Sequence, residues 1–313
     1  MHVPVLLDRC IELLGPALSA PDAILVDATL GLGGHSEAFL STFSDLTLVG
    51  VDRDPIALVK AGERLAKFGD RFVPRAGEHE NLASLLATVN GGRINAILFD
   101  LGVSSMQLDE PSRGFSYSRD APLDMRMNPQ DELNAAQIVN TYSEAELVGV
   151  LRDFGEERSA RRIAKAIIAA RNNAPITSTA ELAELVRDAI PQAAKRTGGH
   201  PAKRTFQALR IEINREIQGL PAALDAALGA LVVGGRIAVI SYHSLEDRIV
   251  KRRFAADSKE TSPIRLPVIP DAARPAFHLL TRGAAVPSAL EISEKPRAAS
   301  AKLRAAERVR GDA

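Results

Sequence analysis

The sequence has one cysteine, no tryptophan and few other aromatic residues. A lone thiol at Cys10 excludes an intramolecular disulfide and is typical of a protein from a reducing cytoplasm. One cysteine cannot supply the roughly three or four thiolates of an iron–sulfur cluster, and no histidine–cysteine cluster has metal-ligand spacing. We therefore expect a cytoplasmic protein that holds no metal.

Long apolar runs are missing as well. No stretch reaches the ~18 apolar residues of a membrane helix. The start of the chain, "MHVPVLLDRC", lacks a basic segment followed by a long apolar one, so no signal peptide is expected. Hydrophobic residues make up 46% of the 313 residues and charged residues 25%, which is ordinary for a globular protein with a sizeable core.

The chain has no net charge, but its charge is unevenly placed. Residues 1–60 carry eight acidic and three basic side chains, a balance of −5, which leaves +5 for the rest. Segment 295–310 alone contains six basic residues and a single acid, Glu307. This asymmetry points to a polyanionic partner for the later part of the chain.

Apolar runs and helical patterns alternate along the first third of the chain, which indicates βαβ units and a parallel sheet. Buried strands are expected at 23–30, 46–52, 71–77 and 94–102. A fifth strand is expected at 235–241, and a final antiparallel pair at 277–281 and 301–309. The fold class is α/β, with a Rossmann-like, mostly parallel sheet whose last strand is antiparallel.

A helical segment interrupts this alternation after the fourth strand. Residues 103–130 have no steady period, and helical patterns then follow at 134–141, 143–153, 156–172 and 179–190. The simplest architecture is a discontinuous α/β core of 1–108 and 205–313 that carries a helical insert at 109–204.

The glycine-rich turn "VDATLGLGGHS", residues 26–36, follows the first strand. Ligands of open parallel sheets bind beyond the carboxyl ends of the strands, and glycines there let the backbone approach them closely. A dinucleotide turn needs a third glycine where Ser36 stands, which argues against an NAD-type oxidoreductase. The pattern is closer to the acid-x-Gly-x-Gly-x-Gly turn of S-adenosylmethionine-dependent methyltransferases, with Thr29 at the first glycine.

Two further acids end neighbouring strands and strengthen this interpretation. Asp52 closes the second strand, where it is well placed for a ribose diol, and Asp100 closes the fourth. His79, after the third strand, is a candidate for the adenine contact or a surface histidine. Gln107, just beyond the Asp100 turn, is a candidate for a polar contact to the ligand. The alternative to a ligand site is that the glycine turn is purely structural and that an aspartate at a strand end only acts as a cap.

With these residues in place, the chain closely resembles the bacterial 16S ribosomal RNA cytosine-N4 methyltransferase family. The resemblance runs almost end to end and in order. The matching stretches are "HVPVLL" (2–7), "GLGGHS" (31–36), "DRDP" (52–55), "DLGVSSMQLD" (100–109), "RGFSYSRDAPLDMRM" (113–127), "GEERSARRIAKAI" (155–167), "HPAKRTFQALRIEIN" (200–214) and "SYHSLEDRIVK" (241–251).

The resemblance implies methylation of a decoding-centre cytidine, with S-adenosylmethionine as cofactor and 16S rRNA of the small ribosomal subunit as partner. Its cofactor contacts fall on Gly33, Gly34, His35, Asp52, Asp100 and Gln107, and the adenine position aligns with His79. A non-catalytic RNA-binding assembly factor is the alternative from another functional class. The sequence leaves the oligomeric state open.

The reaction needs an acceptor for the protons of the exocyclic N4. Asp100 is the first candidate, and it serves either the base or the cofactor. Asp109 and Asp124 are further acceptors, and His243, after the fifth strand, is a candidate to hold the target nucleotide. Phe115 and Tyr117 are candidates for the wall against which an unstacked base lies, or for insert core.

Contact with RNA is expected from the basic residues of the insert and of the core that follows it, since bases neutralise phosphates and position the RNA. Arg158, Arg161, Arg162 and Lys165 fall on one face of the helix expected at 156–172. Further candidates follow along the chain at Lys195, Arg196, Lys203, Arg204, Arg210, Arg248, Lys251, Arg252 and Arg253.

Overall fold

The computed structural model describes residues 4–191, 200–260 and 274–311. The chain divides into a core unit, Met1–Gly102 with Ile217–Ala313, and an insert unit, Val103–Glu216. The insert unit extends beyond the 109–204 expected from the sequence, because Phe206 and Leu209 pack within its hydrophobic core. No helix among the described residues is long and apolar enough to cross a membrane.

The core unit is built on one sheet, which in the described part of the chain has seven strands in the order β3-β2-β1-β4-β5-β7-β6. Strands β1 to β5 run parallel, and β7 pairs antiparallel with both β5 and β6. Their bounds are β1 Ile24–Asp27, β2 Thr47–Asp52, β3 Phe72–Ala76, β4 Ile94–Asp100, β5 Leu231–Ser241, β6 Phe277–Leu279 and β7 Lys302–Arg308.

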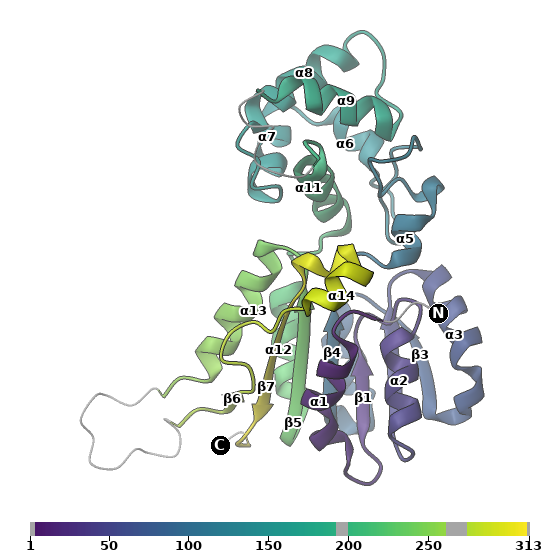
Figure 1. Cartoon of the computed structure of the whole chain (residues 1–313), viewed down its shortest axis with the longest axis vertical. Coiled ribbons are helices and arrows are strands. Elements are labelled where there is room, and N and C mark those ends of the chain that lie inside the picture. Colours follow the sequence, from purple (N-terminus) through teal and green to yellow (C-terminus); the bar gives the residue numbers. More distant parts are fainter. Residues whose placement is uncertain (1–3, 192–199, 261–273, 312–313) are drawn as a thin grey trace. The chain divides into compact units, whose positions relative to one another are not determined.

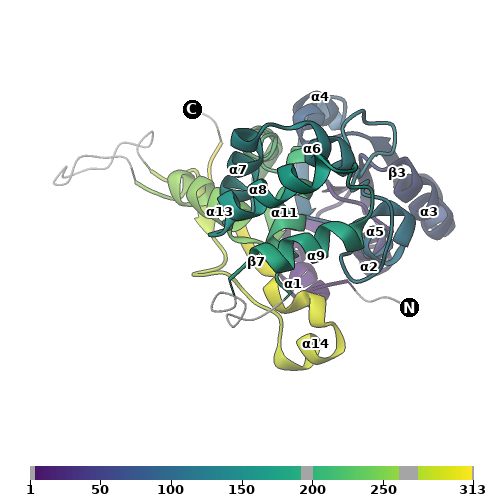
Figure 2. The same cartoon turned by 90° about the horizontal axis from the view of Figure 1, so that it is seen from above.

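Helices cover both faces of this sheet, because residues of the central strands alternate between two apolar cores. Val26 and Phe99 pack against α4 (Leu82–Ala87), α12 (Leu220–Ala230) and α13 (Ser244–Asp257). Leu25 and Leu98 pack on the opposite face against α1 (Leu7–Leu18), α2 (Gly34–Thr42) and α3 (Pro55–Leu65). Figure 2 shows α4 on one side of the sheet and α1 and α2 on the other (Figures 1 and 2).

The remaining elements of the core unit are short. Helix α14 (Ala289–Glu294) lies between β6 and β7 in sequence. Short 3-10 segments connect other elements at η1 Ala66–Arg71, η2 His79–Asn81, η3 Asn90–Gly92 and η6 Pro296–Ser300.

The insert unit is helical and has its own core, formed by residues such as Ile138, Leu151 and Ile163. Its elements are α5 Ser105–Asp109, η4 Pro111–Arg113, α6 Ala135–Thr141, α7 Glu144–Asp153, α8 Ala160–Arg171, α9 Thr179–Ala189 and α11 Lys203–Asn214.

The fold class predicted from the sequence is confirmed. The sheet is mostly parallel with antiparallel strands at one end, and helical structure follows β4. One helix differs from its prediction, because α8 begins at Ala160 and not at 156. Glu156 has a left-handed backbone (φ 47°), which cannot continue a helix.

Candidate active site

Three carboxylates lie at the carboxyl edge of neighbouring parallel strands. Strand β1 lies between β2 and β4, and the three strands end in Asp27, Asp52 and Asp100. From β1 the sheet continues to β2 and β3 on one side and to β4 and β5 on the other, so the direction in which successive strands are added reverses between β1 and β4. Open α/β sheets bind ligands at such a point. The topology therefore brings together the acids that the sequence suggested for one site.

The turn after β1 depends on its glycines. Gly33 is left-handed (φ 71°), and a Cβ atom on it would lie 3.0 Å from the Leu65 side chain. A Cβ atom on Gly34 would lie only 2.7 Å from Cγ of Pro4. These glycines let the turn fold tightly beneath the start of the chain and leave its backbone close to the strand ends.

The two departures from the glycine pattern have structural roles. The Ser36 hydroxyl donates a 2.7 Å hydrogen bond to Oδ2 of the buried Asp27. The Thr29 hydroxyl accepts a 2.5 Å hydrogen bond from the backbone N–H of Asp100. Burial raises the pKa of Asp27 to about 6, and the Ser36 hydroxyl opposes that rise. Ser36 thus supports the Asp27 carboxylate, and Thr29 links the turn to β4.

Replacing Ser36 with alanine is expected to lower the free energy of unfolding by about 1–3 kcal/mol, since a buried carboxylate loses a donor. The loss is expected to grow as pH rises through 6, because Asp27 is protonated below that pH and charged above it. Urea unfolding at pH 5 and pH 8 measures the difference. Ser41→Ala is the matched control on α2, because Ser41 is exposed. Equal losses in the two variants would contradict this role of Ser36.

Asp52 is organised by the same turn. Its Oδ2 accepts the backbone N–H of Gly31 at 2.7 Å, and its Oδ1 accepts that of Asp54 at 2.8 Å. Burial raises the pKa of Asp52, and these two hydrogen bonds counter the rise. Each carboxylate oxygen has a second lone pair, so both can still accept a ligand hydroxyl.

Asp100 has a neighbouring side chain at each of its carboxylate oxygens. The Tyr242 hydroxyl donates to Oδ1 at 2.9 Å, and Nδ1 of His35 lies 3.6 Å from Oδ2. Burial raises the pKa of Asp100 to about 7, and Glu246 adds to the rise, whereas the Tyr242 hydrogen bond opposes it. A carboxyl group with this pKa accepts a proton near neutral pH.

His35 is a buried part of this arrangement. Its Nε2 lies 3.1 Å from the carbonyl oxygen of Val5, and burial lowers its pKa, so the ring is neutral near pH 7. The start of the chain is in turn bound by α14 and by the residue that caps its carboxyl end. The N–H of Leu6 donates to Glu291 at 2.8 Å, and Lys295 donates to the Pro4 carbonyl at 3.0 Å.

Two other candidates for cofactor contact lie on separate units. His79 begins η2 in the core unit, and its ring meets Phe99 edge-on at 5.9 Å. Burial lowers the pKa of His79 to about 4, with a contribution from Arg53, so its ring is uncharged. Gln107 lies in the insert unit, where its Oε1 accepts the Ser104 N–H at 3.0 Å in a capping box of α5.

His243 caps a helix. It is the N-cap residue of α13, where its Nδ1 accepts the N–H of Glu246 at 3.4 Å and its Nε2 lies 3.1 Å from Glu246 Oε1. Its side chain is only 6% exposed. The buried His243 therefore has a structural role as a helix cap, and its role as a nucleotide contact stays a prediction.

The aromatic candidates belong to the core of the insert unit. Phe115 is buried, and the guanidinium of Arg113 lies 5.9 Å from its ring centroid. Tyr117 is partly buried, stacks on His200 at 4.5 Å and meets Phe206 edge-on at 5.6 Å. Of the two, Tyr117 retains more accessible surface for a base.

The two other acidic candidates have different surroundings. Asp109 is the exposed last residue of α5. Asp124 is paired with Arg126 through both carboxylate oxygens, at 2.9 and 2.6 Å. Burial tends to raise the pKa of Asp124, but the hydrogen bonds and charge of Arg126 hold it below the usual value. Asp124 is therefore a poor proton acceptor.

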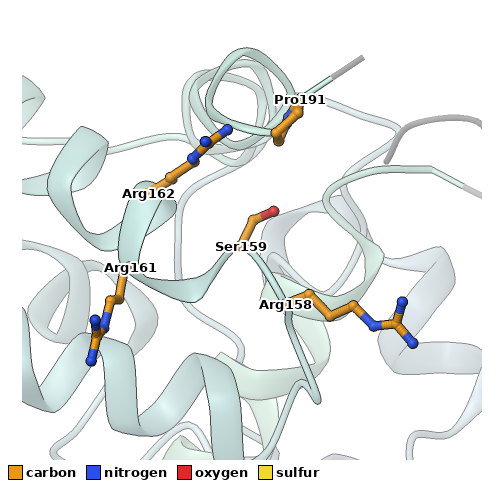
Figure 3. Close-up of a pocket in the computed structure, with 5 residues that line it drawn as sticks. All are labelled: Arg158, Ser159, Arg161, Arg162 and Pro191. Carbon is orange, nitrogen blue, oxygen red and sulfur yellow. The ribbon is translucent and has the colours of Figure 1, made fainter. Parts of the chain in front are cut away.

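A pocket of about 380 Å³ on the insert unit is lined by Arg158, Ser159, Arg161, Arg162 and Pro191. All three arginines are exposed, and no ion-pair partner for them exists within residues 4–191, 200–260 and 274–311. Figure 3 shows their guanidinium groups extending in different directions around Ser159. Guanidinium groups that point in different directions suit contacts to several phosphates along a nucleic-acid backbone better than contact to a single anion.

The predicted basic face of α8 needs one correction. Arg158 precedes the helix, because α8 begins at Ala160, so it is not on the same face as Arg161 and Arg162. Lys203 and Arg204 are exposed at the start of α11, and Arg204 donates to the Glu156 carbonyl at 3.3 Å. Lys195 and Arg196 lie outside the described residues.

The basic segment 295–310 is used largely inside the core unit. Lys302 and Arg304 both bind Asp247, at 3.2 and 2.7 Å. The buried Arg308 donates to backbone carbonyls, including that of Leu231 at 2.9 Å. The charge of this segment therefore indicates internal pairing more than a polyanionic partner.

Sequence reasoning assigned no role to Tyr242 or Val5, although both lie within stretches that carried the resemblance. Their contacts join residues 142 and 30 positions apart, respectively. The signal that was available is the aromatic residue directly after β5, since β5 is the hydrogen-bonded neighbour of the strand that ends in Asp100.

Comparisons with protein families and with known sequences both find similarity to methyltransferases. The profile of the MraW methylase family matches residues 1–309. The Ribosomal RNA small subunit methyltransferase H of Streptomyces avermitilis is 55% identical over 312 residues, which cover 100% of this chain and 98% of that protein. The protein of the same name from Mycolicibacterium gilvum is 57% identical over 311 residues, covering 99% of this chain and 84% of its own length.

Proposed function

Because the chain belongs to the MraW methylase family, we propose that it transfers a methyl group from S-adenosylmethionine to N4 of a cytidine in 16S rRNA of the small ribosomal subunit. The observation that carries this proposal is the end-to-end match to ribosomal RNA small subunit methyltransferases at 55% identity. The geometry at the carboxyl ends of β1, β2 and β4 supports it.

The strand ends fit the proposed cofactor. The glycines at Gly33 and Gly34 let the turn pack closely against Leu65 and Pro4, which places its backbone at the strand ends where a ligand binds. The Asp52 carboxylate is fixed by two backbone N–H groups and keeps lone pairs for the two hydroxyls of a ribose. His35, His79 and Gln107 are the proposed remaining contacts, and no metal is part of the proposal.

Asp52→Ala is expected to weaken retention of S-adenosylmethionine roughly 10- to 100-fold, because hydrogen bonds to a charged acceptor are lost. Equilibrium dialysis with labelled cofactor measures this. Asp45→Ala removes an exposed acid just before β2 and serves as the control. Equal retention by the two variants would show that Asp52 does not bind the ribose.

The proposed acceptor atom is N4 and not C5, because C5 methylation of cytosine needs a thiolate nucleophile. The one thiol, Cys10, is 0% exposed within the apolar core around α1. Burial raises its pKa well above the usual value, and the charge of Asp100 adds to the rise, so Cys10 stays an uncharged thiol.

The exocyclic amine of cytosine is a weak nucleophile, because its lone pair is delocalised into the ring. The bound cofactor supplies an electrophilic methyl group on a sulfonium centre. The protein holds the amine in line with that methyl group, an effect worth about 7–11 kcal/mol in well-oriented systems. In this proposal Asp100 accepts a hydrogen bond from the amine and then takes its proton.

The insert unit is the proposed RNA-binding part. Arg158, Arg161 and Arg162 are exposed and have no ion-pair partner among the residues that the structure describes, which suits contacts to phosphates, and Lys203 and Arg204 are further contacts. The target base has to leave its stack, and Tyr117 is the better placed of the two aromatic candidates to lie against it, because Phe115 is buried.

Two experiments separate the alternatives. Retention of S-adenosylmethionine without enhanced NADH fluorescence supports the methyltransferase, whereas the reverse result favours an NAD-type oxidoreductase. Transfer of labelled methyl groups to small subunits, measured with the purified chain, excludes an assembly factor that only binds RNA. RNA binding without transfer would favour that factor.

A further inference from the structure

Tyr242 is the feature of the core unit to which the proposed function gives no role. It follows Ser241, the last residue of β5, and Ile240 of β5 pairs with Asp100 of β4 in the parallel register. This pairing directs the Tyr242 hydroxyl to Oδ1 of Asp100, at 2.9 Å. Burial and the neighbouring Asp100 carboxylate raise the pKa of Tyr242 far above its usual value, so the hydroxyl keeps its proton and donates it.

The second oxygen of Asp100 faces an acceptor. The Val5 carbonyl, 3.1 Å from Nε2 of His35, requires the ring proton to be on Nε2. Nδ1 of the neutral ring is therefore an acceptor, and it lies 3.6 Å from Oδ2 of Asp100. Oδ1 accepts the tyrosine hydroxyl, whereas the nearby ring atom of His35 offers Oδ2 no proton, so Oδ2 is the oxygen that can take one.

We propose that Tyr242 is a positioning residue: its hydroxyl orients the Asp100 carboxylate and favours its ionised form, which makes Oδ2 the oxygen that receives the proton of the substrate amine. The inference rests on the proposed function. In the step, a bond forms between nitrogen and the methyl carbon while the carbon–sulfur bond breaks and its electron pair stays on sulfur. The N–H proton passes to Oδ2 of Asp100 and later to solvent.

Several groups besides Tyr242 act on the ionisation of Asp100. Glu246 on α13 favours the protonated form, and the buried Asp27 and Cys10 also face the carboxylate. His35 is kept neutral by burial and adds no charge at pH 7. The Tyr242 hydroxyl is thus the neighbour that most favours the charged form, and its loss has to raise the pKa of Asp100 above about 7.

The test is the pH profile of methyl transfer by Tyr242→Phe, measured in single turnovers on small subunits. Because the carboxylate is the active form, the acidic limb of the profile is expected to move up by about one pH unit. The rate then falls roughly tenfold near pH 6.5 and stays within about twofold of wild type at pH 9. Retention of S-adenosylmethionine is expected to be unchanged.

Tyr142→Phe is the matched control, because it removes a tyrosine hydroxyl bonded to a carboxylate, that of Glu212 at 3.0 Å, within the insert unit. Its profile is expected to overlay that of the wild type. A loss of rate in Tyr242→Phe by the same factor at every pH would overturn the inference, since a structural defect has that effect.

A second measurement does not depend on activity. Carboxyl ¹³C shifts, assigned to Asp100 by comparison with Asp100→Asn, report its pKa directly. A higher pKa in Tyr242→Phe than in the wild type supports the inference, and an unchanged pKa overturns it. Absence of methyl transfer by the wild type would instead refute the proposed function, so the two failures are distinguishable.

Discussion

Asp100→Asn is expected to reduce the rate of methyl transfer by at least about 100-fold, the lower range of general base contributions. The amide has nearly the shape of the carboxylate, and its oxygen still accepts the Tyr242 hydroxyl that lies 2.9 Å from Oδ1. It cannot, however, take a proton from the substrate amine. Retention of S-adenosylmethionine is expected to change by less than about tenfold, because the charge of Asp52 remains.

Asp70→Asn, at an exposed acid of η1, is the control for this change. Parallel measurement of Asp109→Asn separates the two candidate acceptors. A large loss in Asp109→Asn with near-normal transfer in Asp100→Asn would move the proton-accepting role to Asp109. Loss of cofactor retention alone in Asp100→Asn would assign Asp100 to the cofactor and not to the base.

Reversal of two charges on the insert, Arg161→Glu with Arg162→Glu, is expected to weaken binding of small-subunit RNA by roughly tenfold or more. Both arginines are exposed without an ion-pair partner in the described part of the chain, so their charge is available to phosphates. The slope of log affinity against log salt is expected to fall by about two. Cofactor retention should not change, because neither arginine is among the proposed cofactor contacts.

The matched control carries the same change in charge at paired arginines. Arg152→Glu with Arg187→Glu alters two exposed residues of the same unit that already contact acids, Asp153 and Asp188. An affinity for RNA that is the same for both double variants across a salt series would remove the Arg158–Arg162 region from the substrate site.

The strand ends were predictable because they depend on local sequence. Each of the acids Asp27, Asp52 and Asp100 follows a short apolar run, and the alternation with helices makes the runs parallel, so one edge of the sheet collects all three. The final antiparallel pair was also predicted, from the runs at 277–281 and 301–309, whereas the order of the strands became known only from the fold.

The partners of those acids were not predictable, because they depend on distant parts of the chain. Ser36 counted against a dinucleotide turn, but its positive role, the hydrogen bond to the buried Asp27, required the fold. Tyr242 reaches Asp100 only because β5 pairs with β4. The start of α8 was predicted too early, because the sequence is amphipathic from residue 156 onward. Glu156 has a left-handed backbone and cannot be part of the helix, which is not apparent from the sequence pattern.

The identity of the methylated nucleoside is the most direct test of the proposed function. Small subunits from a strain that lacks this protein are incubated with the purified chain and labelled S-adenosylmethionine, and the RNA is then digested and mapped by mass spectrometry. We expect one labelled cytidine in 16S rRNA that carries the methyl group on N4, and loss of this product with Asp100→Asn. Label on C5 of cytosine, on another base, or on no RNA at all would contradict it.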